Sequence, residues 1–71
     1  MKLKTLVNAL WNGIDGIDKI DIYLGTPAAP VFLSSLEPNA ALNCYGDMRV
    51  KKFNLWHEHE HDEIILDIIL A

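Results

Sequence analysis

Cysteine is almost absent from this sequence. The single cysteine, Cys44, cannot form a disulfide within the chain, and such chains are typical of reducing compartments. The lysines near the N-terminus are not followed by the apolar stretch and small-residue cleavage site of a secretory signal peptide. Residues 64–70 form the longest apolar run, and Asp67 interrupts it far below the roughly 20 residues that a membrane helix requires. These absences predict a soluble, cytoplasmic protein without a membrane partner.

A constellation of catalytic residues is also missing. Cys44, Ser34 and Ser35 are the nucleophile candidates, and none has the strand-turn-helix context of an activated nucleophile. Asp15 and Asp18 form a carboxylate pair, but their glycine-rich surroundings offer no apolar walls that would distinguish an acid from a base. The sequence therefore predicts a non-enzymatic protein.

Positive charge is scarce as well. Six lysines and arginines stand against ten aspartates and glutamates, which gives a formal net charge of −4. The acidic side chains concentrate in one segment, at Glu58, Glu60, Asp62, Glu63 and Asp67. The short basic run over residues 49–52 is expected to be the solvated face of a strand. Because an acidic patch repels phosphate, we expect no direct contact with nucleic acid.

The length and the apolar content favour one small folded domain over residues 1–71. A chain of 71 residues is near the size at which a single hydrophobic core is marginal. Apolar residues make up 51% of the sequence, which argues against disorder.

The first half of the chain shows helix periodicity and then strand periodicity. Residues 2–12 place apolar side chains at helical spacing, and Asn12-Gly13 supplies a stop signal. Residues 13–18 (G-I-D-G-I-D) are expected to be a connector, with Ile14 and Ile17 turned onto the core. Residues 19–24 alternate as a half-buried strand. A proline-containing loop over 25–30 then leads to a short partner strand over 31–34. The apolar stripe of the helix consists of Leu3, Leu6, Val7, Leu10 and Trp11.

The second half predicts a helical turn and two strands. Pro38 suits the first position of a single turn over 38–42. The strand over 47–57 changes parity at Lys51-Lys52, which predicts a β-bulge. The last strand, over 63–70, is apolar on both faces, so it is expected to be central in the sheet or to contact a partner. The predicted fold is α+β, an N-terminal amphipathic helix packed on an antiparallel sheet of about four strands, in the order helix-β-β-short helical turn-β-β.

Three histidines occupy alternate positions in the segment W-H-E-H-E-H-D-E. On a strand, His57 and His59 would share a face about 6.6–6.8 Å apart, which makes them a candidate half-site for zinc. His61 would lie about 13 Å from His57 along an extended strand, too far for the same ion. The alternative is a solvated turn between two strands, which the run of polar residues favours. We therefore expect no resident cofactor, although adventitious binding of zinc or nickel in vitro is expected.

Three segments give the chain a resemblance to a group of known proteins: K-L-K-T-L-V-N-A-L, K-I-D-I-Y-L-G and I-I-L-D-I-I-L. The pattern resembles small uncharacterised accessory proteins of bacteriophages and mobile elements, mainly of Gram-positive bacteria. The chain departs from them in the H-E-H-E-H segment and in the Pro-Ala-Ala-Pro loop. The resemblance implies a phage or mobile-element origin, and it carries over no site residues. Among such products, small acidic anti-defence proteins, similar to anti-CRISPR proteins, occupy a basic surface that is meant for nucleic acid.

Together these features predict a non-enzymatic protein that binds a host or phage protein through the 53–70 region. Its sharpest form is an acidic inhibitor of a host nucleic-acid-handling defence protein, with Trp56 as an aromatic anchor. One alternative is a small metal-binding module built on the histidine cluster. Another is a homodimeric accessory protein, in which Ile65 and Ile69 help two final strands to pair across a two-fold axis. The expected partner-binding residues are Trp56, Glu58, Glu60, Asp62, Glu63, Ile65 and Ile69, and the expected metal ligands are His57 and His59.

Overall fold

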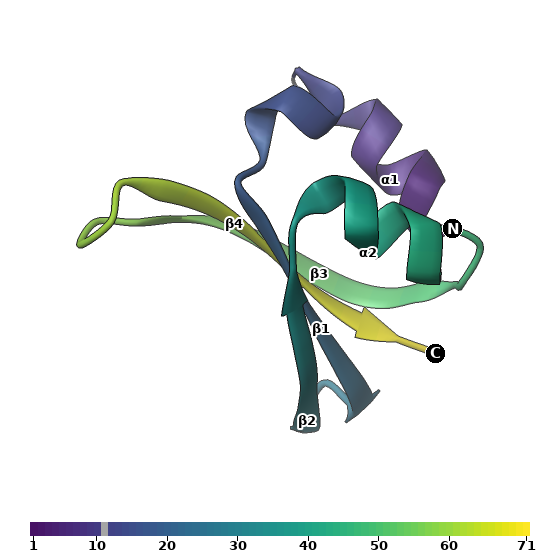
Figure 1. Ribbon diagram of the computed structural model, residues 1–71. Helices are drawn as coiled ribbons and strands as arrows, with labels where there is room; N and C mark the ends of the chain where they lie inside the picture. Colours follow the sequence, from purple (N-terminus) through teal and green to yellow (C-terminus); the bar gives the residue numbers. More distant parts are fainter. Residues whose placement is uncertain (11) are drawn as a thin grey trace.

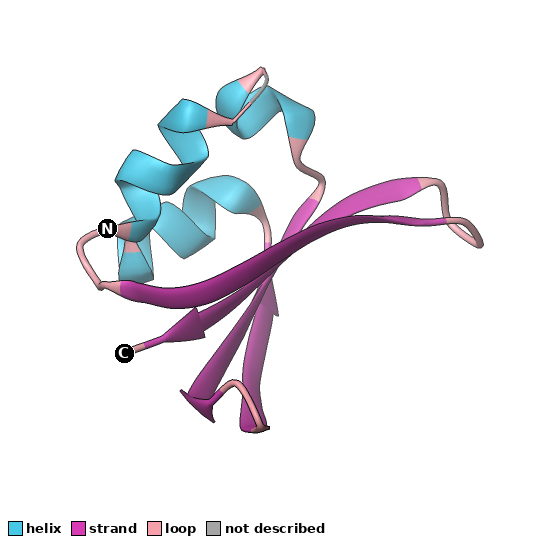
Figure 2. Ribbon diagram, turned by 180° about the vertical axis from the view of Figure 1, so that it is seen from behind, coloured by secondary structure: helices cyan, strands magenta, loops and turns pink. Residues whose placement is uncertain are grey.

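A computed structural model describes residues 1–10 and 12–71 of the protein (Figure 1). The four strands form one sheet in the order β2-β1-β4-β3, and the helices lie on one of its faces (Figures 1 and 2). The predicted α+β class and the four-stranded sheet are therefore confirmed. The elements are α1 (Leu3–Ala9), the 3-10 helix η1 (Gly13–Gly16), β1 (Lys19–Thr26), β2 (Ala29–Leu36), α2 (Pro38–Tyr45), β3 (Val50–Glu58) and β4 (Glu63–Leu70).

The last strand lies in the middle of the sheet, between the first and the third. β1 and β2 are antiparallel, as are β3 and β4, whereas β1 and β4 run parallel. The expectation of a wholly antiparallel sheet is wrong at this central pair. Parallel neighbours need a long crossover between them. Here β2, α2 and β3 supply it, because all three lie between β1 and β4 in the chain.

The hydrophobic core fills the space between the helices and the covered face of the sheet. Alternate residues of β1 and β4 point into it, as the period of two in a strand requires. Leu3 and Val7 of α1 and Ala41 of α2 pack from the helix side, each with no exposed surface. The fully buried strand residues of this core are Ile20, Ile22, Leu66, Ile68 and Leu70.

The N-terminal helix is shorter than the predicted span of 2–12. α1 ends at Ala9, and Leu10 has the extended dihedral angles φ −79° and ψ 156°. The N–H of Leu10 donates to the carbonyl of Val7, a tightened final turn that closes the helix early. Asn12 and Gly13 do adopt positive φ angles of 65° and 54°, but they lead into η1 instead of capping α1 directly. Trp11, the last residue of the predicted stripe, lies outside the described residues.

The connector after α1 packs as predicted, since Ile17 is buried and Ile14 packs against the core. The second helical segment is longer than expected. α2 spans Pro38–Tyr45, with Pro38 in the first turn, where a missing N–H costs little. In the part of the chain that the structure describes, no helix has both the length and the apolarity needed to cross a membrane.

The loop predicted over residues 25–30 is largely strand. β1 continues to Thr26 and β2 begins at Ala29, so that only two residues form the turn. Pro30 is paired with Gly25 inside the ladder, which is tolerated because β2 is an edge strand. Gly25 has a φ of 103°, and a Cβ atom there would lie 3.0 Å from the carbonyl oxygen of Ala29. The turn therefore requires glycine at this position.

The β-bulge predicted at Lys51-Lys52 is confirmed. Val50 pairs with Leu70 and Lys52 pairs with Ile69, so that Lys51 is the extra residue of β3. The bulge keeps Val50 on the helix side of the sheet although the parity of the sequence changes. The Lys51 ammonium group donates a hydrogen bond of 2.9 Å to the carbonyl of Gly25, at the far end of β1.

Leu55 and Leu66 provide a matched test of this core, because they are direct cross-strand partners with different burial. Leu66 has no exposed surface, whereas Leu55 on the edge strand is 45% exposed. We expect Leu66→Ala to lower the free energy of unfolding by about 2–5 kcal/mol, a large part of the roughly 5–15 kcal/mol of a small domain. Leu55→Ala is expected to cost less than about 1.5 kcal/mol. Urea denaturation of both variants measures the difference, and equal losses would contradict the difference in burial between Leu66 and Leu55.

Candidate functional site

The face of the sheet that points away from the helices is named here the open face. Strand alternation assigns to it the residues between the core positions, such as Asp21 and Tyr23 of β1 and Asp67 and Ile69 of β4. Among the described elements, no helix packs on this face (Figure 2). The open face is therefore the surface on which sheet side chains are available to a partner.

Aromatic rings occupy the open face on both sides of β4. The rings of Tyr23 and Phe32 meet edge to face, with centroids 5.5 Å apart and an interplanar angle of 72°. Phe32 is 55% exposed. On the other side, Trp56 of β3 is 39% exposed and lies opposite Ile65. Exposed rings that are held in place by neighbouring side chains are typical anchors of protein interfaces.

Asp67 lies near the middle of this aromatic surface. Its Oδ2 accepts a hydrogen bond of 3.0 Å from the indole N–H of Trp56. Its Oδ1 has almost no solvent contact and no hydrogen-bond partner among the described residues. Asp21 is its direct neighbour on β1. Burial raises the pKa of Asp67, and the negative charge of Asp21 raises it further, while the hydrogen bond from Trp56 acts in the opposite direction.

Tyr23 shares this environment. Burial raises the pKa of the Tyr23 phenol, and the charges of Asp67 and Asp21 contribute in the same direction. The phenol ring is therefore close enough to both carboxylates to experience their negative potential. Asp21 and Asp67, which are direct partners on β1 and β4, therefore give this part of the open face a negative potential.

A groove with a volume of about 280 Å³ lies beside Asp67. Tyr23 and two prolines come from the β1–β2 hairpin, and the opposite wall comes from β3. Asp67 and Ile69 contribute from the central strand between these walls. The groove is thus mainly apolar, with one carboxylate and one ammonium group in its lining. The lining residues are Tyr23, Pro27, Pro30, Lys52, Phe53, Asn54, Asp67 and Ile69.

Residues 58–63, which comprise the turn between β3 and β4 and the strand residue at each end of it, are named here the hairpin tip. The hairpin tip projects beyond the helices (Figure 1). The Glu58 carboxylate accepts hydrogen bonds from the backbone N–H groups of Glu60 at 2.8 Å and His61 at 2.9 Å. Desolvation acts to raise the pKa of Glu58, but hydrogen bonds from His61 and Glu60 outweigh it and lower the pKa. Asp62 has a φ of 52°, a left-handed conformation that aspartate tolerates in a turn. The hairpin connection predicted from the polar run is confirmed.

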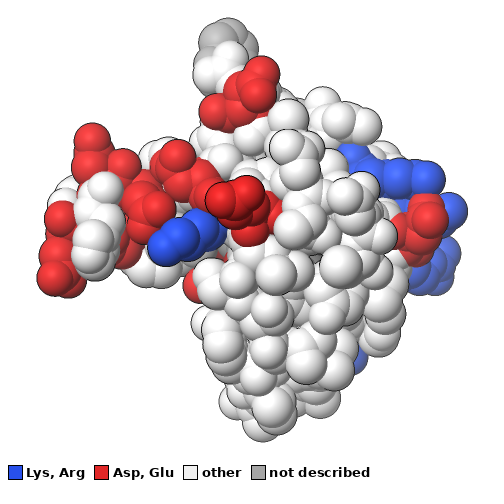
Figure 3. All heavy atoms as spheres, viewed as in Figure 1, with Lys and Arg blue, Asp and Glu red and all other residues white. Residues whose placement is uncertain are grey.

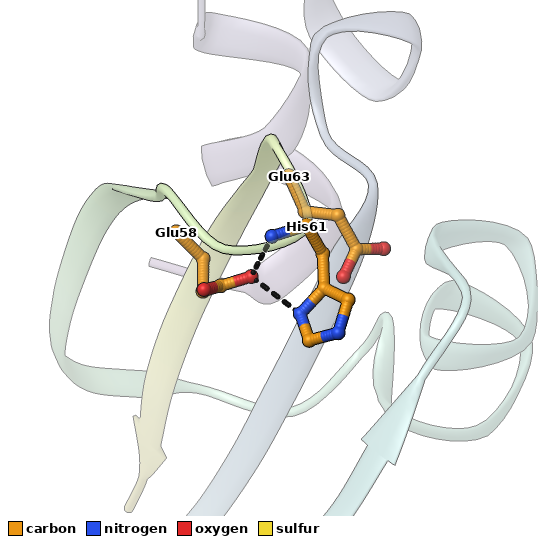
Figure 4. Close-up of side chains that lie close together, drawn as sticks. All are labelled: Glu58, His61 and Glu63. Atoms are coloured by element: carbon orange, nitrogen blue, oxygen red, sulfur yellow. Dashed lines mark hydrogen bonds and ion pairs between the residues drawn. The ribbon is translucent and has the colours of Figure 1, made fainter.

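His57 and His59 lie side by side, and the zinc half-site expected at these two residues stays a prediction. The rings of His57 and His59 meet edge to face with centroids 4.6 Å apart, and His57 Nε2 lies 2.6 Å from Asp62 Oδ1. His61 is the histidine whose ligating atom lies within 4.8 Å of two other ligating atoms, those of Glu58 and Glu63 (Figure 4). Within residues 1–10 and 12–71, neither His57 nor His59 belongs to a group of three such side chains.

Charge is separated along the molecule. Figure 3 shows acidic side chains gathered along the projecting β3–β4 hairpin, while most lysine and arginine atoms lie at the opposite side of the view. At that opposite end, the Asp47 carboxylate lies 2.6 Å from Lys4 and 3.8 Å from Lys2. The hydrogen bond and charge of Lys4, with a contribution from Lys2, lower the pKa of Asp47. At the tip, Lys19 lies 3.3 Å from Glu63, and the other close basic groups are imidazoles, with His57 2.6 Å from Asp62 and His61 2.9 Å from Glu58.

The residues expected to bind a partner fall into two groups. Trp56, Ile69 and Ile65 all lie on the open face, but Ile65 is buried there, with 7% of its surface exposed. The four predicted acids, Glu58, Glu60, Asp62 and Glu63, form the hairpin tip.

The expected pairing of two final strands across a two-fold axis is wrong. Both edges of β4 are already hydrogen-bonded, to β1 and to β3, so Ile65 and Ile69 cannot take part in edge-to-edge pairing. The strands at the sheet edges are β2 and β3. Any strand pairing between two copies has to use one of these.

Sequence reasoning missed the central position of Asp67 and the contribution of Tyr23 and Phe32. One signal was available, since Asp67 is the single charged residue in an otherwise apolar run of the sequence. A lone acid on a strand that is apolar on both faces must either be desolvated or mark a surface that is not fully covered. The structure shows that both conditions hold at Asp67.

No protein-family model, curated protein or solved structure significantly matches this chain. The resemblance to phage and mobile-element accessory proteins therefore stays a prediction.

Asp67 is expected to lower the stability of the fold at neutral pH. A carboxyl group with a raised folded-state pKa binds its proton more tightly in the folded protein, so stability falls as pH rises from the unfolded pKa through the folded pKa. Asp67→Asn removes this charge and keeps an oxygen that accepts from Trp56. We expect the variant to have a higher urea midpoint than the wild type at pH 7, with the difference vanishing near about pH 3, where the free carboxyl group is protonated. An equal or lower midpoint at pH 7 would contradict the desolvation of Asp67, and Asp15→Asn, at an exposed position, serves as the control.

Proposed function

We propose that the protein is a non-enzymatic interaction protein, and that it binds a basic surface of a protein partner through the open face and the hairpin tip. The observation that carries the proposal is the sheet face without a covering layer in the described chain, where Trp56 donates a hydrogen bond to Asp67 from β3 and the rings of Tyr23 and Phe32 meet on β1 and β2 at the other side of β4. Exposed apolar area of this kind, bordered by polar groups, is characteristic of interaction surfaces.

The two parts of the surface serve different physical purposes. The rings and Ile69 offer apolar area that loses water on contact, which supplies most of the affinity of an interface. The carboxylates of Glu60 and Asp62 are exposed on the projecting tip, where they attract a positively charged surface over a distance of about one Debye length, roughly 8–10 Å. A basic partner is therefore favoured over an acidic one.

The sharper form of the proposal is that the partner is a nucleic-acid-handling protein of a host defence system, and that the chain is a phage or mobile-element product. Proteins that bind nucleic acid present lysine and arginine to the phosphates. A small acidic surface with aromatic anchors competes for such a site without needing a catalytic group. The resemblance of the sequence to accessory proteins of phages and mobile elements supports the same conclusion.

Reducing the negative charge of the tip is expected to weaken partner binding. The double variant Glu60→Lys with Asp62→Asn changes the net charge by the same amount as the control Glu37→Lys with Asp15→Asn, whose exposed side chains lie on η1 and at the start of α2. The immobilised wild-type chain captures proteins from lysates of Gram-positive bacteria, the captured protein is identified by mass spectrometry, and its affinity is then measured with purified components. We expect the tip variant to weaken binding at least tenfold and the control to leave it within about twofold.

Affinity for the purified partner should also fall as salt is raised from 50 to 300 mM, because exposed charges are screened. Binding that is insensitive both to salt and to the tip variant would contradict the acidic contact. A captured protein with an acidic surface, or none that the purified chain binds, would contradict the proposal as a whole.

The second candidate function is a small metal-binding module, and the cluster of Glu58, His61 and Glu63 favours it. Three ligating atoms within 4.8 Å of one another offer imidazole and carboxylate ligands, which zinc accepts. Isothermal titration with zinc separates the two histidine sets. If this cluster binds the ion, His61→Ala abolishes the heat signal and His59→Ala leaves it unchanged. The opposite pattern would assign binding to His57 and His59, and no binding at micromolar zinc would remove this function.

A further inference from the structure

We infer that the groove beside Asp67 receives one cationic side chain, an arginine or a lysine, of the protein partner. The inference rests on the proposed function, and it adds which kind of side chain the partner must place beside Asp67. Its basis is the unused hydrogen-bonding capacity of Asp67, the shape of the groove and the placement of the neighbouring charges.

The Asp67 carboxylate has only part of its hydrogen-bonding capacity in use. Oδ2 accepts from Trp56, and Oδ1 has no partner within the described residues. A desolvated carboxylate oxygen without a donor is unfavourable, and proteins rarely keep one without a function. Asp67 lines the groove, and the terminal torsion of aspartate is broad and two-fold, so rotation of the carboxylate allows it to present an oxygen to a donor in the groove. A cationic donor supplied from outside then forms a charge-assisted hydrogen bond, stronger than a neutral one.

The groove suits a side chain that is apolar along its length and charged at its end. Pro30 and Ile69 line it with apolar surface, on which the methylene groups of lysine or arginine pack. The Tyr23 ring also lines the groove, and an aromatic face attracts a nearby cation. A neutral aliphatic side chain would fill the same space but would leave Asp67 unpaired. Charge complementarity therefore selects a cation.

The charged neighbours of Asp67 strengthen this selection. Asp21 lies beside it on β1 and adds negative potential, with its Oδ1 accepting from the Ser35 hydroxyl. The nearby lysines on either side are engaged elsewhere, because Lys19 lies 3.3 Å from Glu63 and the Lys51 ammonium donates to the Gly25 carbonyl.

Lys52 also lines the groove, and it forms no ion pair within the described part of the chain. Its positive charge opposes the bound cation and does not neutralise Asp67. Removing the positive charge of Lys52 should therefore strengthen the binding of a positively charged side chain in the groove.

The experiment is an NMR titration of the full 15N-labelled chain with three capped amino acids: N-acetyl-arginine amide, N-acetyl-lysine amide and the neutral isostere N-acetyl-citrulline amide. The signals followed are the Trp56 indole N–H and the backbone amides of Asn54 and Ile69. We expect one or both cations to shift these signals saturably, with a dissociation constant of roughly 1–10 mM for a single side chain. Citrulline should shift them at least tenfold less. The stronger of the two cations identifies the residue that the partner presents.

Matched variants then assign the binding to Asp67. Asparagine has nearly the same shape as aspartate, and Asp67→Asn is expected to lower the affinity for the cation at least tenfold. Asp15→Asn, which removes an exposed charge from η1, should leave this affinity unchanged. Lys52→Gln should tighten binding about twofold or more because it removes the opposing charge. The 15N spectrum of each variant shows directly whether it is folded.

Three results would overturn the inference. The first is that the citrulline and arginine compounds shift the NMR signals equally, and the second is that the cations shift only signals of the hairpin tip. The third is that Asp67→Asn binds the cations with unchanged affinity. Failure of this inference and failure of the proposed function give different results. If Asp67→Asn binds the identified partner as tightly as the wild type while the tip variant loses it, the interaction stands and the groove contact is wrong. If the capped cations bind in the groove but no basic partner is captured, the groove contact stands without its proposed use.

Discussion

β4 is hydrogen-bonded along both edges, in parallel to β1 and antiparallel to β3, and this double pairing determines how the rest of the chain is placed. The parallel side requires a crossover, which places α2 on the same face as α1 and closes the core over Leu66 and Ile68. The opposite side of the same strand carries Ile65, Asp67 and Ile69 on the open face. One strand thus supplies the centre of the core and the centre of the candidate binding surface.

The sequence predicted the features that depend on neighbouring residues. The alternation of Ile20 and Ile22 indicated β1, and the change of parity at Lys51 indicated the bulge, because both patterns follow from the local period of a strand. The parallel pairing of β1 with β4 was not predicted, since periodicity does not say which strands become neighbours. The strand character of Pro30 was missed for a related reason: proline is excluded from central strands but accepted at an edge, and edge position is a property of the whole sheet.

The candidate site was predictable only in part, again for physical reasons. Runs of charge are visible in a sequence, so the acids of the hairpin tip were identified. The importance of Asp67 arises from three strands at once: Asp21 lies beside it on β1, and Trp56 reaches it from β3. The lone charge in the apolar run of residues 64–70 indicates that Asp67 is unusual, but it does not show which side chains of the neighbouring strands meet the carboxylate. The histidine spacing did not indicate the contact between His61 and Glu58, because the turn separates His61 from the strand that carries His57.

The described residues leave one face of the four-stranded sheet uncovered, with Trp56 at one side of the Asp67 carboxylate and Tyr23 and Phe32 at the other. Solvent paramagnetic relaxation of the free protein, measured with an inert soluble gadolinium chelate, tests this most directly. The account predicts strong relaxation of the Phe32 and Trp56 ring protons and protection of the Leu66 and Ile68 methyl groups. Rings as well protected as those methyl groups, at concentrations where the chain is monomeric, would show that the open face is already covered and would contradict the account.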